Sequence, residues 1–428
     1  MQAADAATMR RRVIWSSTIG NALEWFDFVV FALFAAIIGH LFFPTHDAAA
    51  GLLAAYGLLA VAYIARPIGG IFFGAWADRV GRKRALITIV LLMAIGTAMI
   101  GLLPTYQQIG IAAPLLLLVA RLLQGFSAGG EFGTSTAMLI EFAPPGRRGL
   151  YASFQFVAQA LAFAFGAGFA FALTAALSPD ALQSWGWRVP FLLGIVIGPV
   201  GIYLRRAVDE TPEFKAFLQR RAGIPNTPLR DVLLRYPRAL IALLLVVSGL
   251  TCYTYLSTVF LPNFFSTELG LKLANAQLGL FVLNLLGALM LPFTALLSDR
   301  IGRRSTMVPA LILYIIVGYF LTRALIDAPS HALMWTLQST GIIMFFMVGP
   351  GSALILEAFP VNVRSTGASI VYNLAVAIFG GLAPLAVGWL YQSTQDKMMP
   401  FYCLAFGLVL TLAGLALVPS HHSAVDPG

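Results

Sequence analysis

Long apolar stretches separated by short polar breaks occupy almost the whole chain, from Val13 to Val418. A helix needs about 20 apolar residues to cross a hydrocarbon layer of roughly 30 Å. Twelve stretches are long enough, and they cover residues 13–43, 50–77, 85–104, 111–141, 149–177, 189–206, 238–266, 274–298, 305–326, 331–359, 364–392 and 398–418. The pattern therefore predicts an all-α membrane protein with twelve transmembrane helices.

The placement of basic residues predicts the orientation of these helices. Of the 27 Lys and Arg residues, 21 fall at alternate breaks on the side that also holds the N-terminus, and four fall on the other side. Basic residues near helix ends are retained in the cytoplasm, so we expect a multi-pass protein of the inner (plasma) membrane with both termini cytoplasmic. The net charge of +9 is then a topology signal, and it excludes nucleic acid as a partner.

The longest polar break divides the helices into two sets of six. We predict an N-terminal six-helix bundle over residues 1–204, a cytoplasmic linker over 205–237 and a C-terminal six-helix bundle over 238–428. Within the linker, TPEF is a capping motif for a short helix. We interpret the linker as a solvated tether in preference to a regulatory element.

Each half carries the same loop after its second helix, GAWADRVGRKRAL at 74–86 and ALLSDRIGRRSTM at 295–307. A second repeat, EFAPPGRR at 141–148 and EAFPVNVR at 357–364, supports an internal duplication, which is typical of transporters. We expect the first repeat to form a charge-assisted latch that holds one face shut. Its predicted members are Asp78, Arg79, Gly81, Arg82, Asp299, Arg300 and Arg303.

These loops resemble the signature of the major facilitator superfamily. A narrower resemblance is to its metabolite:H⁺ symporter family, through Gly20, Asn21, Glu24 and Asp27, ARPIGG at 65–70, ARLLQGFSAGGEFG at 120–133 and the Trp187-Arg188 pair. The resemblance implies two pseudo-symmetric six-helix bundles that rock about a central site. It also implies the import of a small organic anion, a di- or tricarboxylate such as citrate or 2-oxoglutarate, together with protons.

Other functions remain as alternatives. A proton-coupled betaine/proline or shikimate-type transporter is the first, although osmolyte carriers of this family tend to end in a long coiled coil, which is not seen here. A membrane receptor or sensor is disfavoured because we find no output domain. An enzyme is disfavoured because the sequence has no HExxH or GxSxG motif.

Five ionisable residues are predicted deep in the helices: Glu24, Asp27, Arg66, Arg121 and Glu131. Each isolated charge at the bilayer centre costs about 2.5 to 3.5 kcal/mol, so we expect them to pair inside the bundle. The resemblance to sugar/proton symporters assigns proton coupling to Asp27 with Arg121. Arg66 and Glu131 have two interpretations: a buried structural ion pair, or an anchor for the substrate carboxylate with a proton acceptor.

Glu24 and Asp27 share one face of the first helix, and clustered carboxylates favour the binding of a proton. We rank the proton sites as Asp27, Glu131 and Glu24, and a structural hydrogen bond near Asn21 is the alternative for Glu24. Arg66 and Arg121 are the predicted substrate anchors. Further predicted substrate-binding residues are Asn21, Gln124, Gln155, Gln159, Tyr253, Tyr255 and Asn373, and Asn284 and Tyr372 are plausible cavity lining.

We expect no metal and no cofactor beyond the coupling ion, and the sequence leaves open whether Na⁺ replaces H⁺. The expected partners are the organic anion and the lipid bilayer, and the expected oligomeric state is a monomer.

Overall fold

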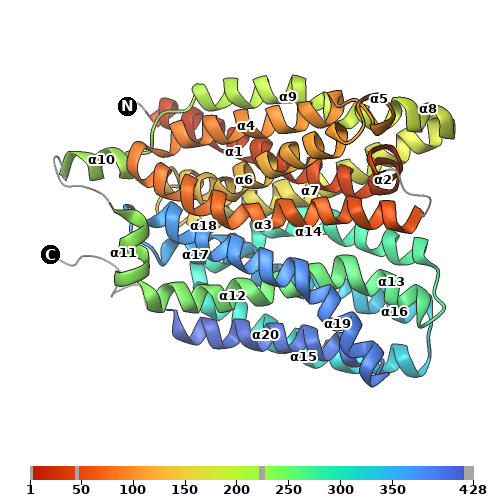
Figure 1. Ribbon diagram of the computed structural model, residues 1–428. Helices are drawn as coiled ribbons and strands as arrows, with labels where there is room; N and C mark the ends of the chain where they lie inside the picture. Colours follow the sequence, from red (N-terminus) through yellow and green to blue (C-terminus); the bar gives the residue numbers. More distant parts are fainter. Residues whose placement is uncertain (1–2, 44–47, 221–226, 419–428) are drawn as a thin grey trace.

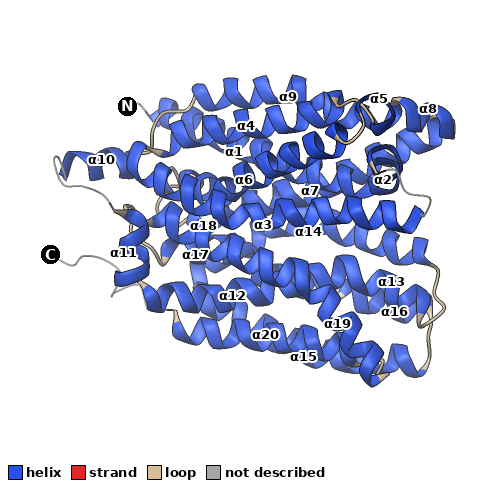
Figure 2. Cartoon of the chain, in the orientation of Figure 1, coloured by secondary structure: helices blue, strands red, loops and turns tan. Residues whose placement is uncertain are grey.

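The computed structural model describes residues 3–43, 48–220 and 227–418, and within them it contains helices and no strand (Figure 2). Eleven helical segments have the length and hydropathy to cross a membrane. The twelfth crossing is α1 (Ala3–Leu33), which α2 (Ala35–Phe42) continues. The predicted twelve-helix fold is thereby confirmed, although α1 begins ten residues before the predicted stretch.

Six crossings form each half of the chain. The other helices of the N-terminal half are α3 (Ala48–Val80), α4 (Arg82–Leu102), α5 (Tyr106–Ile109), α6 (Ala112–Glu141), α7 (Arg148–Ala176), α8 (Pro179–Ser184) and α9 (Val189–Arg206). Those of the C-terminal half are α12 (Pro237–Tyr255), α13 (Leu261–Thr267), α14 (Leu273–Ile301), α15 (Arg303–Asp327), α16 (His331–Ser339), α17 (Gly341–Glu357), α18 (Arg364–Ala375), α19 (Gly381–Thr394) and α20 (Met399–Leu417).

The two halves lie side by side, with α1 to α9 above α12 to α20 in Figure 1. The described linker helices, α10 (Pro212–Arg220) and α11 (Pro228–Arg235), lie together at one end. We call this end the linker end. The halves meet mainly where α7 packs against α14 and where α3 packs against α18.

Two crossings of the C-terminal half are interrupted by a turn of π-helix. Leu256–Phe260 separates α12 from α13, and Val376–Gly380 separates α18 from α19. Such turns are frequent at functional sites in helices. Both place the neighbouring residues, Tyr255 and Tyr372, at the boundary between the halves, as described below.

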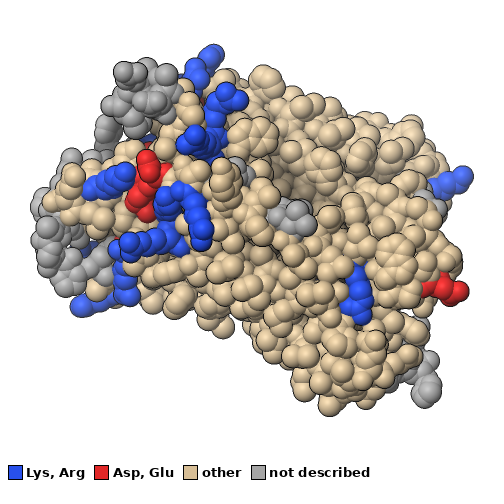
Figure 3. All heavy atoms as spheres, turned by 90° about the horizontal axis from the view of Figure 1, so that it is seen from above, with Lys and Arg blue, Asp and Glu red and all other residues tan. Residues whose placement is uncertain are grey.

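The outer surface matches a protein surrounded by lipid. Large apolar side chains are exposed around both halves, including Phe171, which is 73% exposed, and Phe293, which is 68% exposed. Lys and Arg side chains gather at the linker end, and the flank between the ends is almost free of charge in the view of Figure 3. This distribution suits a chain with its charged ends in water and its flank in lipid.

The first part of the linker is not a solvated tether, so that interpretation is wrong for these residues. Val208, Thr211 and Phe214 are at most 1% exposed, because they pack against the end of the N-terminal half. Arg205, predicted as the first linker residue, lies inside α9 and is buried. Residues 221–226 of the linker and the tail 419–428 lie outside the described residues.

Candidate functional site: a central cavity beside buried ion pairs

A cavity lies between the two halves, with a volume of about 950 Å³ including its open mouth. We call it the central cavity. From the N-terminal half, its wall contains Trp25, Phe156, Gln159, Ala160 and Phe163. From the C-terminal half, its polar lining consists of Thr251, Tyr253, Thr254, Tyr255, Ser257, Thr258, Asn284 and Tyr372.

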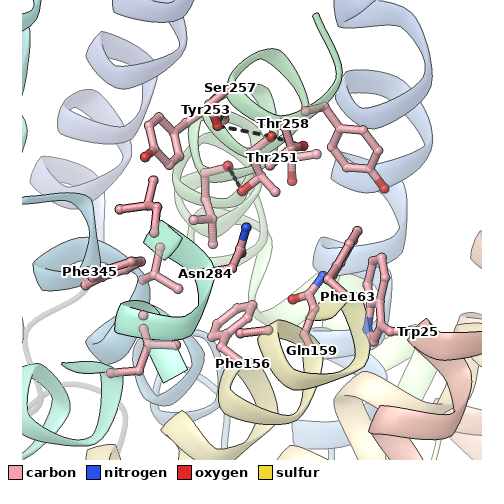
Figure 4. A pocket seen from close by; sticks show the side chains of 18 of the residues that line it. Trp25, Phe156, Gln159, Phe163, Thr251, Tyr253, Ser257, Thr258, Asn284 and Phe345 are labelled. Carbon is pink, nitrogen blue, oxygen red and sulfur yellow. Dashed lines mark hydrogen bonds between the residues drawn. The ribbon is translucent and has the colours of Figure 1, made fainter. Parts of the chain in front are cut away.

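The chemistry of the wall is aromatic and polar, without an acidic or basic lining residue among those described. Gln159 and Asn284 both line the cavity (Figure 4), and the Asn284 amide donates to the carbonyl of Leu280 in its own helix at 2.9 Å. The hydroxyls of Ser257 and Thr258 donate to carbonyls of their own helix, to Tyr253 at 2.7 Å and to Thr254 at 2.6 Å. Their oxygens therefore remain free to accept a hydrogen bond.

Three of the predicted substrate-binding residues line this cavity: Gln159, Tyr253 and Tyr255. Asn284 and Tyr372, predicted as plausible lining, line it as well. The predicted residues that do not line it are Asn21, Arg66, Arg121, Gln124, Gln155 and Asn373. The position of a residue along a helix gives its depth in the membrane, but not whether its side chain points toward a cavity. The sequence alone therefore did not distinguish the residues that line the cavity from those that do not.

Arg66 lies behind the cavity wall and is 1% exposed. Its guanidinium forms an ion pair with Glu24. Its central carbon lies 4.9 Å from the ring centroid of Phe28, 5.1 Å from that of Trp25 and 5.6 Å from that of Tyr63. We call these three rings the aromatic box; contacts of this kind stabilise a cation by about 0.5 to 2 kcal/mol.

The aromatic box reaches the central cavity through two contacts. Trp25 belongs both to the box and to the cavity wall. The hydroxyl of Tyr255, another wall residue, donates to the hydroxyl of Tyr63 at 3.2 Å. Arg66 is therefore one side chain away from the cavity, and its Nε and Nη1 have no hydrogen-bond partner.

Asp27 and Arg121 form the pair that the sequence predicted, with 3.4 Å between Oδ2 and Nη1. Gln124 joins them, because its amide nitrogen donates to Asp27 and its oxygen accepts from Arg121 at 2.8 Å. The same nitrogen donates to Thr97 at 2.9 Å. Asp27 Oδ1 is buried and has no partner, so one carboxylate oxygen remains available to a proton.

Glu131 does not pair with Arg66, so that interpretation is wrong. Arg205 of α9 holds Glu131 in a bidentate pair, at 2.5 and 3.2 Å, and also donates to the carbonyl of Leu86 at 2.7 Å. The interpretation failed because Arg205 was assigned to the linker. Glu24, the actual partner of Arg66, was considered only with its neighbours on α1.

Asn21 and Asn373 form hydrogen bonds between helices. Asn21 donates to the carbonyl of Gln155 at 2.6 Å, whereas Glu24 forms its ion pair with Arg66. Asn373 donates to the carbonyl of Gly129 at 2.6 Å and so joins α18 to α6 across the halves. In this conformation both side chains hold helices together.

At the linker end, Asp78 caps a helix of the opposite half. Its carboxylate accepts from the backbone N–H groups of Ser365 at 3.2 Å and Thr366 at 2.8 Å, and from the Thr366 hydroxyl at 2.7 Å. These residues form the first turn of α18, where a negative charge is stabilised by unpaired N–H groups and the helix dipole. Arg82 lies 3.2 Å from the same carboxylate.

Asp299 occupies the equivalent place in the second repeat. It accepts from the N–H groups of Gly149 at 2.8 Å and Leu150 at 3.0 Å, in the first turn of α7, and pairs with Arg303 at 2.7 Å. Both loops turn at a glycine with positive φ, 106° at Gly81 and 96° at Gly302, a conformation that favours glycine. Of the predicted latch residues, Asp78 and Asp299 therefore join the two halves at this end.

Arg79 and Arg300 were also predicted for the latch, but their side chains are exposed. One residue beyond the aspartate, a helical side chain points about 100° away, so these arginines do not share the direction of Asp78 and Asp299. Arg364 does face it, and pairs with Glu141 at 2.9 Å. The repeat that contains Glu141 and Arg364 was visible in the sequence, and it was the available signal for these missed residues.

The linker adds further contacts to the latch. Glu213 of α10 pairs with Arg148 and, at 2.7 Å, with Arg364, and Thr211 donates to Glu141 at 2.5 Å. Glu210 accepts from the N–H groups of Arg82 and Lys83 at 3.0 and 3.1 Å, at the start of α4.

Comparison with known proteins agrees with this architecture. The family model for the major facilitator superfamily matches residues 17–384. A citrate-proton symporter of Klebsiella pneumoniae is 38% identical over 96% of this chain and 92% of its own. The glycine betaine/proline/ectoine/pipecolic acid transporter OusA of Dickeya dadantii (strain 3937) is 32% identical over 95% and 82%.

Solved structures show the same fold. The proton:xylose symporter XylE bound to 6-bromo-6-deoxy-D-glucose superimposes with a TM-score of 0.79 at 17% identity, over 96% of both chains. The metabolite carriers above agree with the narrower resemblance read from the sequence. By its family model, its relatives and its fold, the chain belongs to the major facilitator superfamily.

Proposed function

We propose that the protein is a proton-driven symporter that imports a small organic carboxylate, with citrate as the first candidate. The observation that carries this proposal is a buried Arg66, held in the aromatic box one side chain from the central cavity. A guanidinium binds a carboxylate through two parallel hydrogen bonds. The relative named a citrate-proton symporter supports the same substrate class.

Proton binding falls on Asp27 in this proposal. Its Oδ1 has no partner, and its Oδ2 faces the positive charge of Arg121 through Gln124. Protonation of Asp27 would remove the attraction to Arg121 and free that guanidinium to change partners. Asp27 thus serves as the proton site, and we propose H⁺ in preference to Na⁺ as the coupling ion.

The latch gives this transporter its alternating access. With Asp78 and Asp299 bonded across the halves, the linker end is shut. Opening that end requires both aspartates to leave the helix N-termini, and the rocking of the halves would expose the cavity there. We place the linker end and both termini in the cytoplasm of an inner-membrane protein that acts as a monomer, as a carrier without catalytic activity.

A betaine or proline carrier is the second candidate, favoured by the relationship to OusA. An aromatic box is a typical site for a quaternary ammonium group. Here, however, the box already contains Arg66, and no acidic side chain is among the residues of the cavity wall. The arrangement therefore fits an anion better than a cation.

Uptake of labelled citrate, 2-oxoglutarate, shikimate and glycine betaine into proteoliposomes tests the proposal. An inward proton gradient should drive citrate or 2-oxoglutarate uptake, and a protonophore should abolish it. Arg66→Gln should lose carboxylate uptake, and Arg323→Gln, which changes an exposed Arg, is the matched control. Uptake of betaine alone, or full carboxylate uptake by Arg66→Gln, would overturn the assignment.

A further inference from the structure

We propose that Glu24 is a built-in substitute for the substrate carboxylate: it neutralises Arg66 when the site is empty and takes a proton when the substrate displaces it. This inference rests on the proposed carboxylate symport and adds a second proton site with a defined role. It links the binding of the anion to the binding of a proton at a single guanidinium.

The buried acids of the N-terminal half have separate partners. Asp27 contacts Arg121 and Gln124, and Glu131 is held by both terminal nitrogens of Arg205. Among the described residues, Glu24 is the acid that contacts Arg66. Glu24 and Arg66 are each 1% exposed, so water does not screen either charge. Each buried charge is therefore neutralised by the other.

Arg66 has unpaired donors that a second carboxylate could satisfy. Its Nη2 contacts Glu24, while Nε and Nη1 are buried without a hydrogen-bond partner. A buried donor without an acceptor is unfavourable, so the site favours a ligand that accepts a hydrogen bond from it. Trp25 and Tyr255 both lie in the wall of the central cavity. Trp25 packs against Arg66, and Tyr255 is hydrogen-bonded to Tyr63 of the aromatic box.

Within the pair, Glu24 is the member that can take up and release a proton. Arg66 stays protonated at all ordinary pH values. Asp27 on α1 and Arg121 on α6 form their own ion pair, in which the two opposite charges cancel. The phenols of Tyr255 and Tyr372 line the central cavity on the side of the C-terminal half and are neutral near pH 7.

Charge balance then couples the two ligands. In the empty site, one guanidinium faces one carboxylate, and the sum is zero. A substrate carboxylate entering beside an ionised Glu24 would leave a net negative charge in a dry site, which is strongly unfavourable. If a proton from the aqueous phase adds to the Glu24 carboxylate, the substrate pairs with Arg66 and the sum returns to zero. When the substrate leaves, Glu24 releases the proton and pairs with Arg66 again.

The test is citrate binding to purified protein at a series of pH values. By linkage, the Kd should rise as pH rises, by up to about tenfold per pH unit for each proton bound with the substrate. The single variant Asp27→Asn should retain part of this pH dependence. The double variant Glu24→Gln/Asp27→Asn should lose the dependence, and at high pH it should bind citrate more tightly than Asp27→Asn does. The matched control is Glu268→Gln, which changes a carboxylate at the end of α13. Its pH dependence of citrate binding should equal that of the wild type.

Two results would overturn the proposal: loss of the whole pH dependence in Asp27→Asn alone, or an unchanged pH dependence when Glu24→Gln is added to it. If the variants with Glu24→Gln fail to fold, a second measurement tests the proposal: citrate is added to Asp27→Asn in a weakly buffered solution, and proton uptake by the protein is recorded. Uptake of a proton supports Glu24 as the second proton site, and no uptake contradicts it. A wild-type protein that binds no carboxylate would instead contradict the proposed function.

Discussion

Asp78 and Thr366 lie on opposite halves of the molecule and are joined by two hydrogen bonds, of 2.8 Å from the backbone N–H and 2.7 Å from the hydroxyl. A residue of one repeat thus caps a helix of the other half. The stability of the shut linker end therefore depends on a contact that must break in every transport cycle.

Asp78→Asn should shift the protein toward the conformation with an open linker end. An amide is a weaker acceptor at a helix N-terminus than a carboxylate, and loss of such a cap costs about 1 to 2 kcal/mol, or roughly a 5- to 30-fold change in population. Distances between spin labels on α3 and α18 would show this as a larger fraction of long distances. Arg300→Gln, which changes an exposed side chain beside Asp299, should leave the distribution unchanged, and an equal shift in both variants would count against the latch.

For the buried ion pair of Glu131 with Arg205, we expect a single substitution to lower the stability of the protein more than the substitution of both residues. Arg205→Met alone leaves Glu131 buried without its counter-charge, and we expect a loss of about 3 to 5 kcal/mol in the free energy of unfolding. Adding Glu131→Leu should restore most of the stability. Thermal unfolding of the detergent-solubilised protein measures both, and a double variant no more stable than Arg205→Met would show that the pair is not the source of the effect.

Close packing of α3 and α6 depends on glycines. A Cβ at Gly125 would overlap the backbone of Ala62, whereas a Cβ at Gly168 of α7 would meet nothing within 4 Å. Gly125→Ala should therefore separate the two helices and lower the melting temperature. Gly168→Ala should be neutral or stabilising by about 0.5 to 1 kcal/mol, and similar melting temperatures for the two variants would contradict the packing account.

Asp27→Asn should separate transport from proton coupling. The amide keeps a hydrogen bond with Gln124 but binds no proton, so accumulation driven by a proton gradient should fall by at least about tenfold. Exchange of labelled for unlabelled substrate, which needs no net proton movement, should persist. A variant that still accumulates substrate at the wild-type rate would remove Asp27 from the coupling mechanism.

The sequence was sufficient for the fold because each crossing carries its own signal in its length and hydropathy. The repeat at Asp78 and Asp299 likewise marked the loops that meet the opposite half. The partners of Asp78 were not readable, because they are backbone N–H groups of Ser365 and Thr366 and any sequence supplies such groups.

The ion pairs were predicted only in part, for a geometric reason. Depth follows from the rise per residue, and it placed Asp27 level with Arg121. Rotation about the helix axis and the identity of the neighbouring helix depend on tertiary packing, so Glu131 and Arg66 were assigned to each other. The predicted sixth stretch, 189–206, has the same bounds as α9, but Arg205 was counted with the linker and was therefore not considered as a partner of Glu131.

The central claim is that a carboxylate and protons cross together, and proton entry measured during substrate uptake tests it most directly. Proteoliposomes would contain a fluorescent pH indicator, start with equal pH on both sides, and receive an inward citrate gradient. The account predicts acidification of the interior that requires citrate, is reduced in Asp27→Asn and is absent with Arg66→Gln. Citrate uptake without acidification would contradict proton symport.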